Sequence, residues 1–536
     1  MQAGHLDATT EISKQQVEEQ LERILASRDF RASDKLSAFL RFVVEETLAG
    51  RSDRIKGYTV ATEVFGRPAD FDPAADPVVR IQAGRLRRRL DTYYHTAGAD
   101  DPVVVEVPKG HYAAAFSSRE SATIAHSPIR TRPTIAVLPF ACIGDSNDAE
   151  SLADGISEEL TVGFTRFMSL AVIARQSTLV YRKTTASIES VSVDLGARFI
   201  VTGSVRQLGD TIRVATQLTD ATDSVQLWAE TMQVDLSTTG MRDIEDRVTT
   251  NVLARIGDEV GAIPRQLVQE SRVKEPESLT VYEATLAFYR YNYHADPNSY
   301  ERTVVALEAA VKDEPGYALA WAQLAEMYTD SAQLGYAGPE DPLTKARAYA
   351  NLALGLDGTC QQAYATLAYV HFALNEHEAA VASAEKAIEL NPNSSYQVAT
   401  AAFWMGLAGS LERACEIINT AEQLNPHGPG WLRLVPLLHY LDTGDADAAL
   451  DEARHFRSPN LAWGPLLRAS IAAMSGDHSV AATSYRELEA LFPEVIEDAG
   501  SYIASYVHFD RHFDALQNGL DIASKMAGRD HPRFRT

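Results

Sequence analysis

Prolines recur at a nearly constant interval in the C-terminal half of this chain of 536 residues. Pro392, Pro426, Pro459 and Pro493 follow one another at steps of 34, 33 and 34 residues, and helical sequence fills the intervals. A period of about 34 residues that ends in proline is typical of arrays in which each unit is a pair of helices. One unit cannot bury its own apolar face, so neighbouring units must stack. The spacing therefore predicts an all-α solenoid over residues 276–528.

These units have the pattern of tetratricopeptide repeats. Residues 363–369 and 384–390 fit the two helices of one unit, and residues 318–328 fit the first helix of an earlier one. A stacked array of about five or six units encloses a concave groove. We expect a protein or peptide partner in that groove. Aromatic residues at first-helix positions are more typical of packing between repeats than of ligand binding, and the candidates are Trp321, Tyr328, Tyr364, Phe372, Phe403, Trp404, Trp431 and Trp463.

A basic helix near the N-terminus is the second strong feature. Residues 80–89 hold five arginines and no acid, although the whole chain has a formal net charge of -24. Apolar residues step by four and three positions through this segment, at Val79, Ala83, Leu86, Leu90 and Tyr93. That spacing places one face in a core and leaves the arginines around the solvent side: Arg80, Arg85, Arg87, Arg88 and Arg89. Exposed arginines on a rigid helix suit DNA phosphates and guanine edges.

The charge of the chain is unevenly distributed. Residues 1–118 contain 16 Lys and Arg against 18 Asp and Glu, a net charge of -2, so the remainder carries -22. An acidic molecule of this kind is not expected to coat nucleic acid as a whole. Binding to double-stranded DNA must therefore be local to the arginine helix. The arginines could alternatively dock on the acidic repeats of the same chain, which would be autoinhibition.

A β-hairpin is predicted directly after the arginine helix, over residues 103–108 and 111–116, with Lys109 at its tip. The helix segment Arg-Leu-Arg-Arg-Arg-Leu at 85–90 and the Lys-Gly-His-Tyr turn at 109–112 resemble the OmpR/PhoB-type winged-helix domain. The resemblance implies a winged-helix-like DNA-binding domain over residues 10–118. Its helix would lie in the major groove, and Lys109 would touch a phosphate. Unlike that family, residues 13–65 predict helices and not a small sheet.

A linker is predicted over residues 119–133, and an α/β domain over residues 134–262. Strands are expected over 134–140 and 170–175, with a helix that opens at Asp154 between them, and residues 211–218 alternate as a half-buried strand does. Four strings in order resemble the TolB N-terminal-type domain: 135–140, 154–155, 203–205 and 227–230. The predicted fold class is thus multidomain α+β: a winged helix, a small α/β TolB-like domain and an all-α tetratricopeptide solenoid.

No catalytic, cofactor-binding or metal-binding constellation stands out, so we expect a protein that is not an enzyme. Cys142, Cys360 and Cys415 follow no metal spacing and are typical of reduced thiols. Relatives with the same TolB-like and repeat regions often carry a class III nucleotide cyclase domain, for which residues 1–118 are too short. The sequence shows no signal peptide and no apolar run that could span a bilayer, which predicts a cytoplasmic protein without membrane contact.

Two functional hypotheses remain open from the sequence. The first is a cytoplasmic transcription regulator that binds DNA through Arg80, Arg85, Arg87, Arg88, Arg89 and Lys109. In that case the TolB-like and repeat regions would bind a partner or effector, and a homodimer is possible because one such domain buries little surface on DNA. The second is a non-catalytic tetratricopeptide scaffold for protein–protein interaction. DNA binding predicts a steep dependence on salt, whereas a scaffold predicts none.

Overall fold

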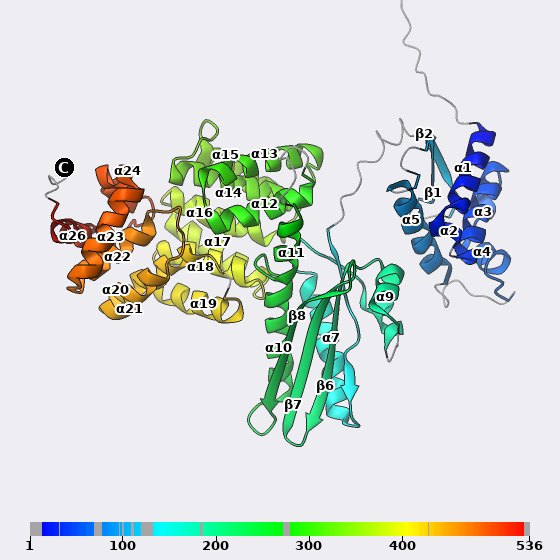
Figure 1. Ribbon diagram of the computed structural model, residues 1–536, viewed down its shortest axis with the longest axis horizontal. Helices are drawn as coiled ribbons and strands as arrows, with labels where there is room; N and C mark the ends of the chain where they lie inside the picture. The colour runs from blue at the N-terminus through cyan, green and yellow to red at the C-terminus, as the bar shows by residue number, and fades with distance from the viewer. Residues whose placement is uncertain are drawn as a thin grey trace, which may run out of the picture. The chain divides into compact units, whose positions relative to one another are not determined.

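The computed structural model describes residues 13–31, 33–68, 78–95, 97–98, 101–108, 112–118, 132–182, 186–271, 279–426 and 428–529. The chain divides into two compact units, Met1–Arg130 and Thr131–Thr536. We describe each unit separately (Figure 1). Lys109 and nearly all of the predicted linker lie outside the described residues.

Unit 1 is a group of helices followed by a two-stranded sheet. Its elements are α1 (Lys14–Ala26), α2 (Arg28–Arg31), α3 (Asp34–Leu48), η1 (Ser52–Arg54), α4 (Gly57–Glu63), α5 (Val78–His95), β1 (Val103–Glu106) and β2 (Ala115–Ser118). The strands pair antiparallel, with Val105 opposite Phe116. A capping box at Ser13 and Gln16 starts α1, since the two side chains satisfy backbone groups of the first turn reciprocally. The expected order of helices and then a hairpin is therefore present.

The core of unit 1 confirms the apolar seam that the sequence predicts for α5. Val79, Ala83, Leu86, Leu90 and Tyr93 are all buried in one cluster with apolar residues of α1 and α3. Burying such side chains contributes about 1.5–3 kcal/mol each for the larger ones. The seam therefore fixes which side of α5 faces the core, and so where its arginines can lie.

Unit 2 begins with a six-stranded mixed sheet. Its strands are β3 (Thr134–Val137), β4 (Ala141–Ile143), β5 (Ala171–Val172), β6 (Phe199–Leu208), β7 (Thr211–Asp220) and β8 (Val225–Asp235). The order is β5-β3-β6-β7-β8, and β4 also pairs with β6. Strands β3, β4 and β5 run parallel to their neighbours, whereas β6, β7 and β8 are antiparallel. The alternating burial along β7 confirms the half-buried strand predicted there.

Helices α7 (Asn147–Phe164) and α10 (Met241–Ile256) pack on one face of this sheet (Figure 1). The shorter α8 (Arg175–Thr178), η2 (Leu179–Tyr181) and α9 (Ile188–Leu195) complete the domain. Helix α7 begins two turns before the predicted start at Asp154, because the Ser146 side chain accepts a hydrogen bond from the Ala149 N–H and caps it there. Gly155 lies inside the helix, where a Cβ would come within 2.5 Å of Glu245 on α10.

Two strand predictions in this domain were too long. The segment expected as a strand over 170–175 pairs only at Ala171 and Val172, and α8 starts at Arg175. The strand expected over 134–140 ends at Val137, after which the Phe140 N–H donates to the Ser157 hydroxyl of α7. A tertiary hydrogen bond at Phe140 and the start of a helix at Arg175 thus follow strands that are shorter than expected, which a local pattern of apolar residues does not reveal.

The rest of unit 2 is helical. It comprises α11 (Ala262–Ser271), α12 (Val281–His294), α13 (Pro297–Asp313), α14 (Ala318–Leu334), α15 (Pro342–Leu356), α16 (Gln361–Ala373), α17 (His377–Leu390), α18 (Ser395–Leu407), α19 (Leu411–Leu424), η4 (Gly430–Arg433), α20 (Leu434–Thr443), α21 (Ala446–His455), α22 (Trp463–Met474), α23 (His478–Leu491), α24 (Pro493–Glu497), α25 (Ala499–Ala504) and α26 (Asp510–Met526). Successive helices from α12 to α23 form antiparallel pairs that stack side by side (Figure 1). This is the predicted all-helical repeat array.

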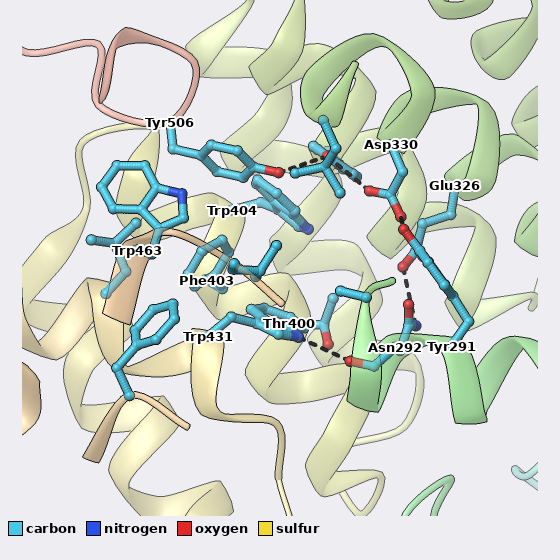
Figure 2. Close-up of a pocket in the computed structure, with 16 residues that line it drawn as sticks. Tyr291, Asn292, Glu326, Asp330, Thr400, Phe403, Trp404, Trp431, Trp463 and Tyr506 are labelled. Atoms are coloured by element: carbon cyan, nitrogen blue, oxygen red, sulfur yellow. Dashed lines mark hydrogen bonds between the residues drawn. The ribbon is translucent and has the colours of Figure 1, made fainter. Parts of the chain in front are cut away.

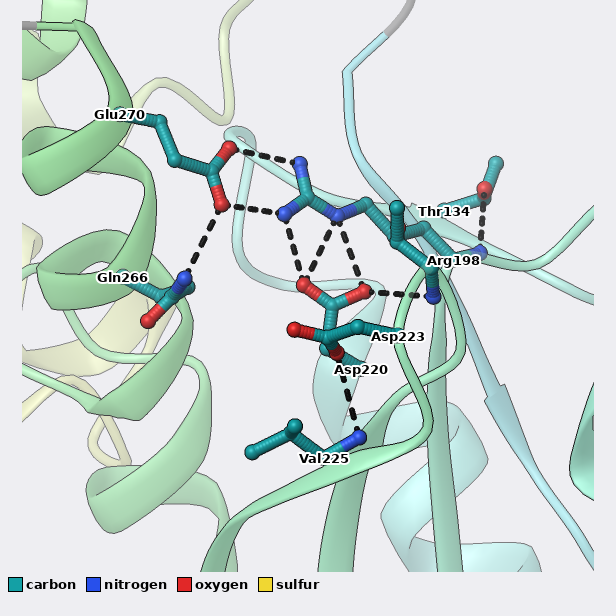
Figure 3. A network of polar contacts seen from close by, with 8 residues as sticks. Thr134, Arg198, Asp220, Asp223, Val225, Gln266 and Glu270 are labelled. Atoms are coloured by element: carbon teal, nitrogen blue, oxygen red, sulfur yellow. Dashed lines mark hydrogen bonds and ion pairs between the residues drawn. The ribbon is translucent and has the colours of Figure 1, made fainter.

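Several polar contacts join the sheet domain to the helices that follow it, and two of these contact points involve charged side chains. Asp258, fully buried after α10, accepts hydrogen bonds from the Tyr396 N–H and from the hydroxyls of Ser394 and Ser395 at the start of α18. A carboxylate at this position satisfies unpaired N–H groups and complements the helix dipole. At the second contact Arg198, beside β6, bridges Asp220 at 2.6 Å and Glu270 of α11 at 2.5 Å (Figure 3).

Candidate functional sites

The arginine helix α5 carries the residues predicted to touch DNA. Arg85, Arg87 and Arg89 are half-buried beside the buried apolar seam of the helix. Arg80 and Arg88 belong to the same helix, and their side chains lie outside the described part of the chain, as does Lys109. The structure thus brings the five arginines onto one helix.

The guanidinium of Arg87 contacts the chain that follows β1. Its Nε donates to the carbonyl of Val107 at 2.5 Å and its Nη2 donates to the carbonyl of Pro108 at 2.9 Å. Partial burial lowers the pKa of Arg87, and the guanidinium stays charged because its ordinary pKa is so high. Arg87 therefore ties α5 to the chain that leaves β1, a role that the sequence did not suggest.

Tyrosines of α5 hold β1 in the same way. The Tyr94 hydroxyl accepts the Val105 N–H at 2.8 Å, and the Tyr93 hydroxyl donates to Asp101 at 2.6 Å. Burial raises the pKa of both hydroxyls, so they remain protonated donors. The strand and the basic helix are consequently held together as one structural piece.

A second candidate site is a hollow within the repeats that has a cavity volume of about 70 Å³ and is partly open to solvent (Figure 2). Helices α12, α14, α16, α18 and α22 supply its walls, together with η4 and the segment after α25. Eight aromatic side chains line it: Tyr291, Tyr369, Phe403, Trp404, Trp431, Phe456, Trp463 and Tyr506. Trp404 stacks on Tyr369 with ring centroids 3.7 Å apart and meets Phe403 edge to face.

Two carboxylates from α14 lie in this aromatic wall. Asp330 accepts hydrogen bonds from the hydroxyls of Tyr291 at 2.8 Å and Tyr369 at 3.0 Å. Glu326 accepts a hydrogen bond from the Gln362 amide at 2.6 Å, and weaker ones from Thr366 and Asn292. No described Lys, Arg or His forms an ion pair with either carboxylate.

Burial governs the protonation of this pair. It raises the pKa of Asp330 to about 6, against the hydrogen bonds from its tyrosines. Burial, together with repulsion from Asp330, raises the pKa of Glu326 to about 8. At neutral pH the pair therefore holds about one negative charge, mostly on Asp330.

Four aromatic residues of this pocket are already candidates in the sequence, where their positions are interpreted as more typical of packing between repeats. Phe403, Trp404, Trp431 and Trp463 line it, whereas Trp321 packs on Tyr349 and donates to a backbone carbonyl elsewhere. The residues that sequence reasoning missed are Tyr291, Glu326, Asp330, Tyr369, Thr400 and Tyr506. The available signal was a pair of acids four residues apart in a helix whose other positions are mostly apolar, because such a spacing places both on one face.

Among the described residues no group of three or more His, Cys, Asp or Glu is arranged to hold a metal ion. Cys360 and Cys415 are buried thiols and Cys142 is partly exposed. No helix in the described ranges is both long and apolar enough to cross a membrane.

Comparison with known proteins identifies two regions of unit 2. Residues 131–251 match the second domain of HilA/YgeH-like transcriptional regulators. Residues 361–394, which cover α16 and α17, match a tetratricopeptide repeat. The sheet domain is thus a domain known from transcriptional regulators, and the helical array contains the repeat that the proline spacing predicted.

Two individual proteins are similar to parts of this chain. The chain is 30% identical over 257 residues to "Putative adenylate cyclase 3" of Rhizobium meliloti (strain 1021), which covers 47% of this chain and 43% of that protein. The chain thus spans less than half the length of that relative. Among solved structures, TolB from Acinetobacter baumannii matches at 21% identity and a TM-score of 0.17, over 22% of this chain and 27% of that one.

Proposed function

We propose that this protein is a transcription regulator that binds double-stranded DNA through unit 1 and a protein partner or effector through its repeats. The observation that carries the proposal is the HilA/YgeH-like regulator domain at residues 131–251, which directly follows the unit that contains the arginine helix. The tetratricopeptide match supports a partner-binding role for the helical array. The protein acts without catalysis in this proposal.

Helix α5 is the DNA-contacting element in the proposal, and unit 1 is a winged-helix-like domain. Three described arginines of α5 stand on a helix whose other face is anchored in the core, so their positions are fixed before DNA binds. Arginines presented in this way bind phosphates and guanine edges without a large loss of side-chain entropy. Arg87 contributes mainly by holding the hairpin, and Arg85 and Arg89 contribute contacts.

Binding of the full chain to a duplex of mixed sequence tests this proposal, with fluorescence anisotropy measured over a series of salt concentrations. The test variant is the double substitution Arg85→Ala and Arg89→Ala. We expect weaker binding and a salt slope smaller by about two, because each lost phosphate contact removes about one released counterion.

The matched control is Arg41→Ala with Arg51→Ala on and beside α3, which changes the net charge by the same amount. Arg41 pairs with Glu22 of α1, and Arg51 pairs with Glu46 of α3. Neither arginine belongs to α5. We expect the control to bind DNA nearly as the unchanged protein does. Equal losses in the two variants, or no binding at low salt, would reject the DNA role and leave the tetratricopeptide scaffold as the function.

A further inference from the structure

The pocket between α12, α14, α16 and α18 combines features that a structural core does not need. Asp330 and Glu326 are 9% and 8% exposed, and no described cation pairs with them. A buried carboxylate is costly unless opposite charge or several hydrogen bonds compensate it. The two acids also stand one helical turn apart, so each raises the cost of ionising the other. Two buried acids at this distance destabilise the ionised form of each other, and a positive charge in the pocket would offset that cost.

A polar group without a partner points to the same place. Thr400 lines the pocket and is 2% exposed, and its hydroxyl has no hydrogen-bond partner in the described structure (Figure 2). A buried hydroxyl left without a partner costs about 1–3 kcal/mol. It can accept a hydrogen bond from an N–H group that enters the pocket. The site therefore presents two carboxylates and one hydroxyl as acceptors.

The aromatic walls determine which kind of cation fits. Trp404, Trp431 and Trp463 are among the strongest cation–π partners in proteins, and the faces of Tyr369 and Trp404 already stack together. Aromatic walls stabilise a strongly hydrated metal ion only slightly. They stabilise an organic ammonium through cation–π contacts with the ring faces and also through apolar contact. An anion would be repelled by the ring faces and by the carboxylates.

The pocket is closed on one side by the chain itself. Tyr506, which follows α25, stands 3.3 Å from the Tyr369 hydroxyl, oxygen to oxygen, and the Gln333 amide donates to the carbonyl of Ser505 at 3.4 Å. Tyr506 thereby forms part of the pocket wall. The remaining space suits a small molecule better than a peptide backbone.

We propose that this pocket binds a small organic amine in its protonated form, with the ammonium held by Asp330 and Glu326 and the apolar body held by the tryptophans. The proposal goes beyond DNA binding and does not depend on it, because it concerns the repeats alone. At neutral pH the carboxylate pair holds about one negative charge, which matches a single ammonium group.

Intrinsic fluorescence of the full chain provides the test, since three of its five tryptophans line the pocket. The probes are trimethylammonium, cyclohexylamine and 2-phenylethylamine, with 2-phenylethanol as the neutral analogue and phenylacetate as the anionic one. We expect at least one amine to bind, the alcohol to bind on the order of tenfold more weakly because it lacks the charge, and phenylacetate not to bind. No binding by any amine, or equal binding of amine and alcohol, would overturn the proposal.

Variants assign the signal to the carboxylates. Asp330→Asn is expected to weaken amine binding by on the order of tenfold or more, since it removes the main negative charge. Glu340→Gln, an exposed acid outside the pocket, is the control and should bind as the unchanged protein does. Circular dichroism melting shows whether Asp330→Asn remains folded. An unaltered affinity in folded Asp330→Asn contradicts the proposal.

The pH profile of the unchanged protein gives a second test that needs no variant. Affinity for an amine should rise between about pH 5 and about pH 8, because first Asp330 and then Glu326 become ionised over that range while the amine stays charged. A flat profile would reject the ion pair. A blocked lysine, Nα-acetyl-lysine methylamide, tests whether the ammonium group comes from a lysine of a partner protein or from a free amine. If it binds more tightly than all free amines, the occupant is a partner protein's lysine and the small-molecule proposal is wrong.

Discussion

Helices α5 and α14 each gather like charges, and the contrast between them separates surface recognition from enclosed binding. On α5 three described arginines flank a buried apolar seam and are half-buried, so part of each side chain is exposed to solvent. On α14 the two acids are buried in a pocket lined by aromatic rings of other elements. The first arrangement suits a large, extended polyanion. The second suits one small cation, because only a ligand that enters the pocket meets the charge.

A buried carboxylate need not form a binding site, and Asp258 shows the alternative. Its oxygens are satisfied by the start of α18, that is, by the Tyr396 N–H and two serine hydroxyls. Asp330 by contrast accepts only two tyrosine hydroxyls and faces a hollow. Asp258 is therefore a joint between the sheet domain and the repeats, and Asp330 is a candidate for ligand binding.

This distinction predicts the largest effect on stability. Asp258→Ala should lower the free energy of unfolding of unit 2 by about 2–4 kcal/mol, since it removes a helix cap and leaves buried donors unpaired. Urea unfolding followed by tryptophan fluorescence measures this, because all five tryptophans lie in unit 2. Asp313→Ala, an exposed acid at the end of α13, is the control. If the two variants unfold alike, Asp258 is not the joint.

A smaller effect on stability should distinguish Arg87 of α5 from an arginine of another helix. Arg87→Ala removes two hydrogen bonds to carbonyls beside β1 and should destabilise the hairpin by about 1–2 kcal/mol, a value lowered by solvent access. Arg41 of α3 pairs with Glu22 and Glu45 and not with the described part of the hairpin, so Arg41→Ala should destabilise the hairpin less. Hydrogen exchange of the Val105 amide in the full chain is the measurement. Equal exchange in both variants would mean that Arg87 does not hold the hairpin.

Sequence reasoning succeeded where a feature is periodic and local. The proline spacing predicted the helical array, and the steps of four and three residues predicted which face of α5 is buried. Both follow from helix geometry alone. The capping box at Ser13 was likewise readable, since its two residues are three positions apart. The predicted DNA contacts on α5 stay a prediction.

The pocket could not be predicted because its residues come from distant parts of the chain. Asn292 and Trp431 are hydrogen-bonded across 139 positions, and Tyr369 and Tyr506 meet across 137. Which helix faces meet depends on the curvature of the array, and a repeat period does not fix that curvature. Glu326 and Asp330 also look ordinary in the sequence, because a helix of this kind usually exposes its acids.

The smallest expected effect concerns the segment after α25, which contributes Tyr506 to the pocket wall. His508 stacks on Phe372 with ring centroids 4.1 Å apart, and its Nδ1 lies 3.1 Å from Nε2 of His377. Burial and the neighbouring His377 lower the pKa of His508 below its ordinary value. The folded contact therefore favours the neutral ring. Its stability is complete above the unfolded pKa of about 6.5 and decreases as the pH falls below that value.

We therefore expect faster hydrogen exchange of residues 505–509 at about pH 5.5 than at about pH 7.5, after correction for the intrinsic rates. His508→Phe keeps an aromatic ring on Phe372 and removes the titrating group, so the pH dependence should disappear. A second histidine lies nearby on α16, where the Nδ1 of His371 is 2.5 Å from a carboxylate oxygen of Glu376. His371→Gln should leave the pH dependence of the segment in place. The opposite result would contradict this prediction. If His371→Gln abolishes the pH dependence of residues 505–509 and His508→Phe does not, the contact between His508 and His377 does not cause it.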